Sequence, residues 1–236
     1  MDRKNFGFVK VAAATPSVKV ADCEHNVSEM VRLAQDASAK GVAAVVFPEA
    51  GITAYTCGDL FNQKLLIDGA LAGLEQYCLA TKELPLISIV GLPLEIGGRL
   101  YNVGAVVSQG KIQGIVPKTF IPNYSEFYDK RWFSSSRESK EKEIHLFGSA
   151  VPVGIDLVFD AGDFRFALEI CEDLWTPIPP SSIHALHGAE LIFNLSASDE
   201  TAGKSSYRKS LVAQQSARCV AGYVYAAAGN GESTTD

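Results

Sequence analysis

Two kinds of hydrophobic pattern alternate along the chain. Short continuous apolar runs, such as residues 42–47 in GVAAVVF, are typical of strands that are buried on both faces of a sheet. Between such runs, apolar residues recur at spacings of three and four, as at Val27, Met30 and Ala34, which is typical of an amphipathic helix. Asn26 stands just before this helical pattern and is a candidate N-cap. The alternation predicts that helices and strands follow each other in turn.

The same two patterns continue to the end of the chain. Helical periodicity is found at residues 58–84, 181–190 and 203–219. Strands are predicted at residues 6–16, 85–94, 99–108, 112–118, 153–160, 164–171, 191–198 and 222–229. Tight turns within 85–118 require antiparallel pairing, whereas helical connections elsewhere favour parallel pairing, so we expect one α/β domain with a mixed sheet. The polar stretch 133–145 is expected to be a solvated loop.

Composition narrows the partners of this domain. The formal net charge is -6 and the sequence has no long basic cluster, so neither a nucleic acid nor an anionic membrane is an expected partner. The longest apolar runs are much shorter than the roughly 20 residues that cross a bilayer, and the first ten residues contain no signal-peptide core. We therefore expect a cytoplasmic protein that acts on small molecules.

The cysteines and histidines do not form a recognisable metal or disulfide pattern. The five cysteines are widely spaced without a C-x-x-C pair, and Cys78 and Cys219 fit as small core residues in helical patterns. His184 and His187 are three residues apart on a predicted helix, but no acidic residue one turn away completes a zinc motif. No metal site is expected, and a Cys-His catalytic pair is the weaker of two interpretations of the reactive groups.

Three reactive side chains follow predicted strands, where the loops of an α/β sheet collect ligands. Glu49 ends VVFPE, Lys118 ends GIVPK, and Cys171 ends FALEIC. Each residue alone is more often a solvated charge or a core cysteine. Together they supply what a thiol nucleophile needs, because Glu49 can remove its proton and Lys118 can stabilise the thiolate and an oxyanion.

These residues, in this order and each on its strand, resemble the carbon-nitrogen hydrolase (nitrilase) superfamily, whose catalytic set is Glu-Lys-Cys. The sequences FPEAGITAYTCGDLF, VPKTFIPNYSEFYDKRWF, EICEDLWTPIPPS, NLSAS and QQSARCVAGYVYAAAGNGESTTD narrow the likeness to the amino-terminal glutaminase domains of glutamine-dependent NAD synthetases. The resemblance covers nearly the whole chain. It implies a four-layer α-β-β-α sandwich that hydrolyses L-glutamine and releases ammonia.

The resemblance also implies roles for individual residues. Cys171 would be the nucleophile that forms a γ-glutamyl thioester, and Glu49 the general base and acid. Lys118 and the backbone N–H of Glu172 would hold the oxyanion. Three further residues fall where the family binds the α-amino and α-carboxylate groups of glutamine: Tyr124, Ser198 and Lys204. For Lys204, a solvated charge at the start of a helix is an equal alternative. Replacing Cys171 or Lys118 by alanine is expected to abolish hydrolysis and leave the fold intact.

One position departs from the family pattern. Many relatives have a glutamate where FYDKRWF has Asp129, as a second carboxylate near Lys118. Aspartate is one methylene shorter, so either the loop moves inward or the contact weakens. Asp129 is the preferred candidate for this role, and Glu126 is the substitute.

The likeness extends to partners outside this chain. Residues 1–236 are expected to be one glutaminase domain that stops short of its last strands, because GNGESTTD offers no capping element after an apolar strand. The domain itself is expected to need no cofactor. ATP and Mg²⁺ would serve only the absent synthetase domain of the same full-length chain, and the family favours a homo-oligomer. Two alternatives remain open, a free-standing amidase for another ω-amide or carbamoyl compound and a catalytically silent scaffold.

Overall fold

A computed structural model describes residues 7–232, in which the apolar run at 85–94 becomes the central strand of a five-stranded sheet. The strand order is β1-β2-β3-β4-β5. The first three strands are parallel, and the last three are joined as antiparallel hairpins, as the turn signals predict. The strands are β1 (Val11–Ala13), β2 (Ala44–Val46), β3 (Ile87–Ile96), β4 (Arg99–Ser108) and β5 (Lys111–Pro117).

A second sheet of four strands is formed by the carboxyl-terminal part of the chain, in the order β10-β11-β12-β13. The strand β10 is antiparallel to β11, and the other pairs are parallel because helices connect them. These strands are β10 (Phe159–Asp160), β11 (Arg165–Ile170), β12 (Leu191–Ser196) and β13 (Gly222–Ala227). Both sheets are mixed.

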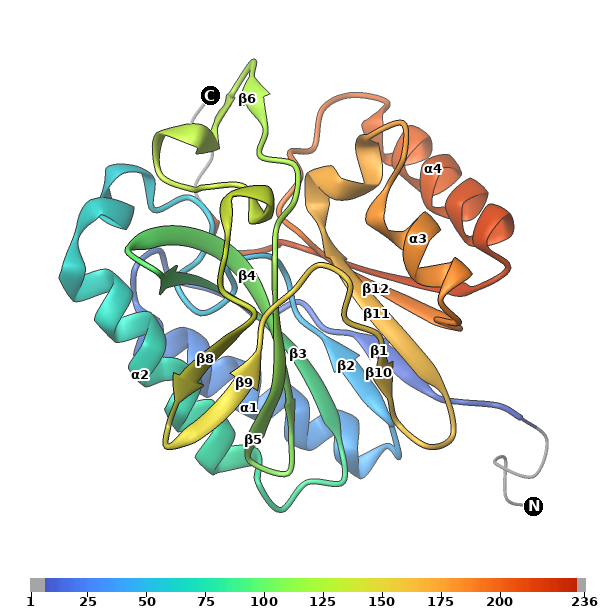
Figure 1. Cartoon of the computed structure of the whole chain (residues 1–236), viewed down its shortest axis with the longest axis horizontal. Coiled ribbons are helices and arrows are strands. Elements are labelled where there is room, and N and C mark those ends of the chain that lie inside the picture. Colours follow the sequence, from blue (N-terminus) through green and yellow to red (C-terminus); the bar gives the residue numbers. More distant parts are fainter. Residues whose placement is uncertain (1–6, 233–236) are drawn as a thin grey trace.

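Helices cover the outer faces of the two sheets, which gives four layers (Figure 1). The first sheet is covered by α1 (Cys23–Ala39) and α2 (Lys64–Thr81), and the second by α3 (Pro180–Leu186) and α4 (Lys204–Cys219). The expected α-β-β-α sandwich is therefore confirmed.

The inner faces of the two sheets pack against each other through large apolar side chains. Val46 and Ile89 of the first sheet join Phe166 and Leu168 of the second in one buried cluster. Gly104 on β4 allows this close approach, because a Cβ there would lie 2.6 Å from the Leu168 Cδ1 atom. The packing brings the carboxyl ends of strands from both sheets to a common edge.

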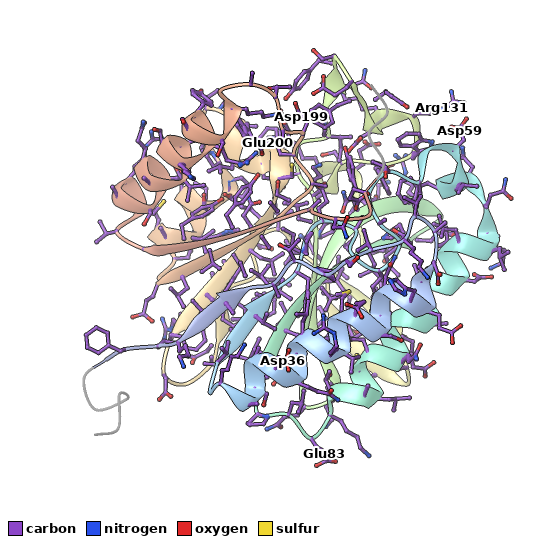
Figure 2. The ribbon with its side chains drawn as sticks, turned by 180° about the vertical axis from the view of Figure 1, so that it is seen from behind. Asp36, Asp59, Glu83, Arg131, Asp199 and Glu200 are labelled. Carbon is purple, nitrogen blue, oxygen red and sulfur yellow. The ribbon has the colours of Figure 1, made fainter. Side chains whose placement is uncertain are left out.

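Short elements above that edge carry several polar side chains. They are η2 (Gly58–Asn62), β6 (Asn123–Tyr124), β7 (Phe127–Tyr128), η3 (Asp129–Arg131), η4 (Ser136–Glu138) and η5 (Cys171–Trp175). The hairpin of β8 (Glu143–Leu146) and β9 (Ser149–Pro152) lies beside β5 instead (Figure 1). Arg131 and Asp59 form an ion pair between η3 and η2, with Nε–Oδ1 2.5 Å, and Figure 2 shows the two residues close together at the surface. The Trp132 indole also donates to Asp59 at 3.0 Å. These contacts fix the segment that begins at Asp129.

The prediction that Asn26 caps the first helix is wrong. Asp22 is the N-cap, and its side chain accepts the N–H of His25 at 3.0 Å. Asn26 is fully buried one turn further on, where its side chain donates to the Ile52 carbonyl at 3.0 Å. Asn26 therefore does not cap the helix, and its side chain instead bonds to a distant segment of the chain.

Two other predictions of local structure need correction. The stretch 133–145 is not all solvated loop, because it contains η4 and most of β8, which pairs with β9. Residues 153–160 form a strand only at Phe159–Asp160. Instead, Gly154 donates its N–H to the Ile115 carbonyl at 3.1 Å and so extends the edge of the first sheet. Apolar alternation without a pairing partner did not produce a strand here.

Candidate active site

The residues Glu49, Lys118 and Cys171, here called the triad, meet where the ends of the two sheets adjoin. Lys118 donates from Nζ to the Glu49 Oε1 atom at 2.6 Å. Consecutive residues of the second sheet link this pair to the thiol. The Ser196 hydroxyl donates to the Cys171 Sγ atom at 3.3 Å, and the Ala197 N–H donates to the Glu49 Oε2 atom at 3.1 Å. The triad is thus assembled from both sheets.

All three members of the triad are buried, with exposed fractions of 1% for Glu49, 1% for Lys118 and 6% for Cys171. A buried carboxylate needs hydrogen bonds in place of water. Asn102 on β4 supplies one, because its Nδ2 donates to the Glu49 Oε1 atom at 2.7 Å. The turn that carries Glu49 lies directly on β3 at Gly91, where a Cβ would be 2.6 Å from the Ala50 nitrogen. Glycine is required at that point.

Asp129 is the second carboxylate beside Lys118. Its Oδ2 atom lies 3.6 Å from the Lys118 Nζ, and its Oδ1 accepts the Tyr55 hydroxyl at 2.8 Å. Burial alone would lower the pKa of Lys118, but the negative groups around it, Glu49 first, raise that pKa above the ordinary lysine value. Burial raises the pKa of Asp129 to about 6, although Lys118 opposes the rise. Glu126 and Asp129 both line a neighbouring cavity, but among the described residues the ion-pair contact with Lys118 is made by Asp129 and not by Glu126.

Cys171 is the first residue of η5 and occupies a strained turn directly after β11. Its φ is +44°, which residues other than glycine rarely adopt. Asp173 supports the turn, because its carboxylate accepts the Ile170 N–H at 3.0 Å. The same carboxylate accepts the N–H groups of the two residues after Lys118, at 3.1 and 2.8 Å. Asp173 therefore ties together the two strand ends that carry the lysine and the thiol.

The thiol is protonated in this environment. Burial, together with the negative charge of Glu49, raises the pKa of Cys171 to about 12, and Lys118 opposes that rise. Ser196, which donates to the sulfur, also shares a hydrogen bond with the Tyr225 hydroxyl. A thiol with such a pKa needs a base to become a nucleophile at neutral pH, and Glu49 is the carboxylate beside it.

The acidic residues next to Cys171 in sequence have partners of their own. The strand β11 ends at Ile170, so strand alternation does not place Glu169 beside the thiol. Glu169 accepts the Ser181 N–H at 2.8 Å, beneath α3. Glu172 accepts the Tyr124 hydroxyl at 2.9 Å through its half-buried side chain.

A cavity of about 510 Å³ lies beside the triad. Its walls include Tyr55, Glu126, Asp129, Trp132, Ser198 and Asp199. Asp199 and Glu200 stand together in the loop that leads into α4, as Figure 2 shows. The cavity is large enough for a small amino acid, and its walls come from four separate segments, within residues 55–58, 126–132, 197–201 and 228–232.

Lys204 is the first residue of α4 and is held at this same edge. It forms an ion pair with Asp199, with only 20% of its side chain exposed. Its Nζ lies 5.3 Å from the centre of the Trp175 ring and 5.8 Å from that of Phe127. The interpretation of Lys204 as a solvated charge is therefore wrong. Tyr124, by contrast, is 55% exposed.

The histidines lie apart from the triad's hydrogen bonds. The Nε2 atom of His184 lies 2.7 Å from the Ile155 carbonyl, and the Nδ1 of His187 contacts the carbonyl of Ile183. Within residues 7–232, no group of three or more His, Cys, Asp and Glu side chains is arranged to hold a metal ion. Over the same residues, no helix is long and apolar enough to cross a bilayer.

Several residues of the site were not anticipated from the sequence. Asn102, Asn194 and Ser196 are polar residues inside otherwise apolar strands, and that interruption is the signal that could have identified them. Tyr55 lies in a bend and Asp173 in η5, and polar residues are common in such short irregular segments, so neither stands out in the sequence. The sequence also lacks a glycine beside Cys171, yet the sharp strand-to-helix turn is present without one.

The family model for carbon-nitrogen hydrolases matches residues 10–235, and the chain belongs to that family. Glutamine-dependent NAD(+) synthetase of Mycobacterium tuberculosis strain H37Rv is 39% identical over 233 residues, which cover 98% of this chain and 34% of the relative. The chain therefore spans about a third of the length of such relatives.

Solved structures agree with this assignment. A glutamine-dependent NAD(+) synthetase from Cytophaga hutchinsonii matches with a TM-score of 0.83 and 29% identity, over 93% of this chain and 36% of that one. An amidase from Nesterenkonia sp. AN1 matches with a TM-score of 0.75 over 95% of this chain and 81% of the amidase. At 16% identity the amidase supports the fold alone. Its structure has acrylamide added to the active-site cysteine of that protein.

Proposed function

We propose that this chain is the glutaminase domain of a glutamine-dependent NAD synthetase. The observation that carries the proposal is the buried cluster in which Lys118 joins Glu49 at 2.6 Å and Asp129 at 3.6 Å beside the Cys171 thiol. Such a cluster is costly to fold and is typical of a site for nucleophilic chemistry. The synthetases that match nearly the whole chain support glutamine as the amide substrate.

The reaction follows from the positions of the triad. Glu49 takes the thiol proton as the Cys171 sulfur bonds to the carboxamide carbon of glutamine. Lys118 and the Glu172 N–H hold the oxyanion of the tetrahedral intermediate. Glu49 then gives the proton to the amide nitrogen, and the carbon–nitrogen bond breaks. Ammonia departs, and the γ-glutamyl group remains bound to Cys171 as a thioester. A water molecule then attacks the thioester with Glu49 as its base, which releases glutamate and restores the thiol.

The polar groups above the triad are suited to the amino-acid end of the substrate. Lys204 would bind the α-carboxylate once that group replaces Asp199 as its partner, because both are carboxylates. Tyr124 and Ser198 would hold the α-amino and α-carboxylate groups from the other sides. Glu172, already a partner of the Tyr124 hydroxyl, adds negative charge that favours a bound ammonium group. A simple amide has neither charged group and would use none of these contacts.

The remaining steps belong to a synthetase domain in the full-length chain. Residues 1–236 would deliver ammonia to that domain, where ATP and Mg²⁺ would activate deamido-NAD for amidation. The glutaminase domain itself would work without a cofactor. A homo-oligomer would place several such units together.

The test compares glutamine with simple amides in the full-length protein. We expect glutamine turnover to exceed that of acetamide or propionamide by at least a hundredfold, and a γ-glutamyl adduct on Cys171 to be detected by mass spectrometry after rapid quenching. Cys171→Ser should abolish turnover. The matched control is Cys57→Ser, which alters another buried thiol, hydrogen-bonded to the Thr53 carbonyl at 3.1 Å, and should retain turnover.

Two results would overturn the proposal. Faster turnover of simple amides than of glutamine would identify a free-standing amidase. Alkylation of Cys171 no faster than that of Cys23, together with no turnover of any amide, would identify a silent scaffold.

A further inference from the structure

A chain of hydrogen bonds, buried at both ends and half-buried at Tyr223, runs from the backbone of Cys171 to Glu169. The Cys171 N–H donates to the Asn194 Oδ1 atom at 3.2 Å, and the Asn194 Nδ2 donates to the Tyr223 hydroxyl oxygen at 3.0 Å. Tyr223 in turn donates to the Glu169 Oε1 atom at 2.5 Å. The Ser181 N–H donates to the other carboxylate oxygen at 2.8 Å, which completes the chain. Asn194 is fully buried and Glu169 is 1% exposed.

The direction of the donors in this chain is favoured from both of its ends, because the Cys171 N–H can only donate. Burial raises the pKa of Glu169, and the hydrogen bonds that it accepts from its neighbours oppose that rise. In its ionised form this carboxylate can only accept, so Tyr223 directs its proton toward Glu169. The Tyr223 oxygen is then free only to accept, and it accepts from the amide nitrogen of Asn194. This fixes which way the Asn194 side chain faces, because its carbonyl oxygen is left to face the Cys171 N–H. An ionised Glu169 and the Cys171 N–H therefore favour the same orientation of the Asn194 amide.

The Cys171 turn depends on such support. A residue at φ +44° lies in a sparsely populated region of backbone conformation and persists there only when its neighbours hold it. The N–H of Ile170 is held by Asp173, and that of Cys171 by Asn194. With both of these N–H groups occupied, the N–H of Glu172 is the next backbone donor along the turn.

We propose that Asn194 is a positioning residue for Cys171, and that Glu169, its partner across β11 and β12, acts directly and through Tyr223 to keep the Asn194 amide in the productive orientation. The proposal rests on the proposed function, because it assigns a task to a residue that holds the nucleophile. Neither Asn194 nor Glu169 touches the substrate. Their effect is on the placement of the sulfur, so they govern kcat and leave glutamine binding unaltered.

Glu169→Gln tests the polarity of the chain without changing its shape. The glutamine carbonyl would accept the Ser181 N–H, so its NH₂ group would face Tyr223. Tyr223 would then donate to Asn194, and the Asn194 amide would turn its own NH₂ toward the Cys171 N–H, where two donors repel. We expect kcat for glutamine to fall about 10- to 100-fold, because small misplacements of a reacting group have effects of that size. KM should change less than threefold.

A double variant tests whether the polarity itself matters. In Asn194→Asp combined with Glu169→Gln, the new carboxylate would accept both the Cys171 N–H and the Tyr223 hydroxyl, and the glutamine NH₂ would donate to the Tyr223 oxygen. Every donor again has an acceptor. We expect kcat of the double variant to be at least tenfold higher than kcat of Glu169→Gln alone. No recovery would overturn the inference.

Tyr223→Phe breaks the same chain in the middle, and Tyr77→Phe is its matched control. Tyr77 on α2 is buried, whereas Tyr223 is half-buried. The Tyr77 hydroxyl donates to Ser88 on β3 of the first sheet at 2.8 Å, far along the chain from Cys171. We expect Tyr223→Phe to lower kcat at least tenfold, and Tyr77→Phe to leave it within twofold of the parent. Equal effects of the two substitutions, or a kcat for Glu169→Gln within twofold of the parent, would reduce the chain to a stability element and overturn the inference.

The measurements separate this inference from the proposed function. All variants are made in the full-length protein, with the melting temperature recorded to establish folding. The rate at which iodoacetamide alkylates Cys171 is measured beside glutamine turnover, and it should fall in Glu169→Gln. If the parent protein does not hydrolyse glutamine, the proposed function fails. The alkylation rates then still decide whether Glu169 controls the thiol, and equal rates in parent and variant overturn that control.

Discussion

Replacing Lys118 by methionine should destabilise the fold as well as abolish catalysis. Methionine has a similar length and no charge, so the carboxylates of Glu49 and Asp129 would stay buried without their cation. Removing one partner of a buried ion pair typically costs about 3–5 kcal/mol of unfolding free energy. The sequence alone led us to expect that substitution of Lys118 leaves the fold intact. The structure changes that expectation, because the Lys118 side chain is only 1% exposed.

The cost of this substitution should depend on pH. Lys118 lowers the pKa of Asp129 in the parent protein, so that pKa should rise above about 6 in Lys118→Met. A carboxyl group with a higher pKa in the folded state than in the unfolded state binds more protons when folded. The free energy of unfolding therefore falls as the pH rises from the pKa of this group in the unfolded state toward its higher pKa in the folded state. The penalty should be larger at pH 8 than at pH 5.

Urea unfolding of the parent and variant at these two pH values measures the effect. The matched control is Lys64→Met on α2, where Lys64 pairs with Asp68 at 2.6 Å but is 85% exposed, and where no resolvable change is expected. Adding Glu49→Gln to Lys118→Met should restore part of the lost stability, because one uncompensated charge is removed. The reasoning is refuted if Lys118→Met at pH 8 is no less stable than Lys64→Met.

Three further substitutions probe other parts of the site. Asp129→Asn should remove an acid limb with a midpoint near the Asp129 pKa of about 6 from the pH profile of kcat/KM, and an unchanged limb would assign it to another group. Lys204→Ala should raise the KM for glutamine about tenfold with a smaller change in kcat, as steady-state kinetics would measure, and an unaltered KM would exclude it from substrate binding. Gly91→Ala should destabilise the fold by about 1–3 kcal/mol in urea unfolding, since its Cβ would be 2.6 Å from the Ala50 nitrogen, and parent-like stability would contradict the close approach.

The triad and the fold class could be predicted because their signals are local. An apolar run that ends at Pro48 and Glu49 reveals both a buried strand and its carboxyl end, and the same holds for Lys118 and Cys171. The turns within 85–118 likewise reveal antiparallel pairing without knowledge of the rest of the chain. The resemblance of longer stretches to a known family then supplied the four layers.

Other features could not be predicted because they depend on which distant segments meet. The bond from Asn26 to the Ile52 carbonyl and the use of Asp173 to join two sheets both rest on such tertiary contacts. The capping of α1 by Asp22 and the hairpin of β8 and β9 are local, but the pattern of apolar residues does not reveal them. The burial of Lys118 is the plainest case, since an isolated lysine after a strand is normally solvated. Periodicity reports which face of an element is apolar, but not which polar group will cover it.

Because the triad is divided between two sheets, the active site is complete only after the two sheets have packed together during folding. Glu49 and Lys118 lie on the first sheet, and Cys171 follows them by more than fifty residues on the second. Contacts between such distant segments form slowly because a long loop must close first. During refolding, helical signal should therefore return before the thiol acquires its native environment. A molecule whose helices are complete but whose sheets have not docked would have every catalytic residue and no active site.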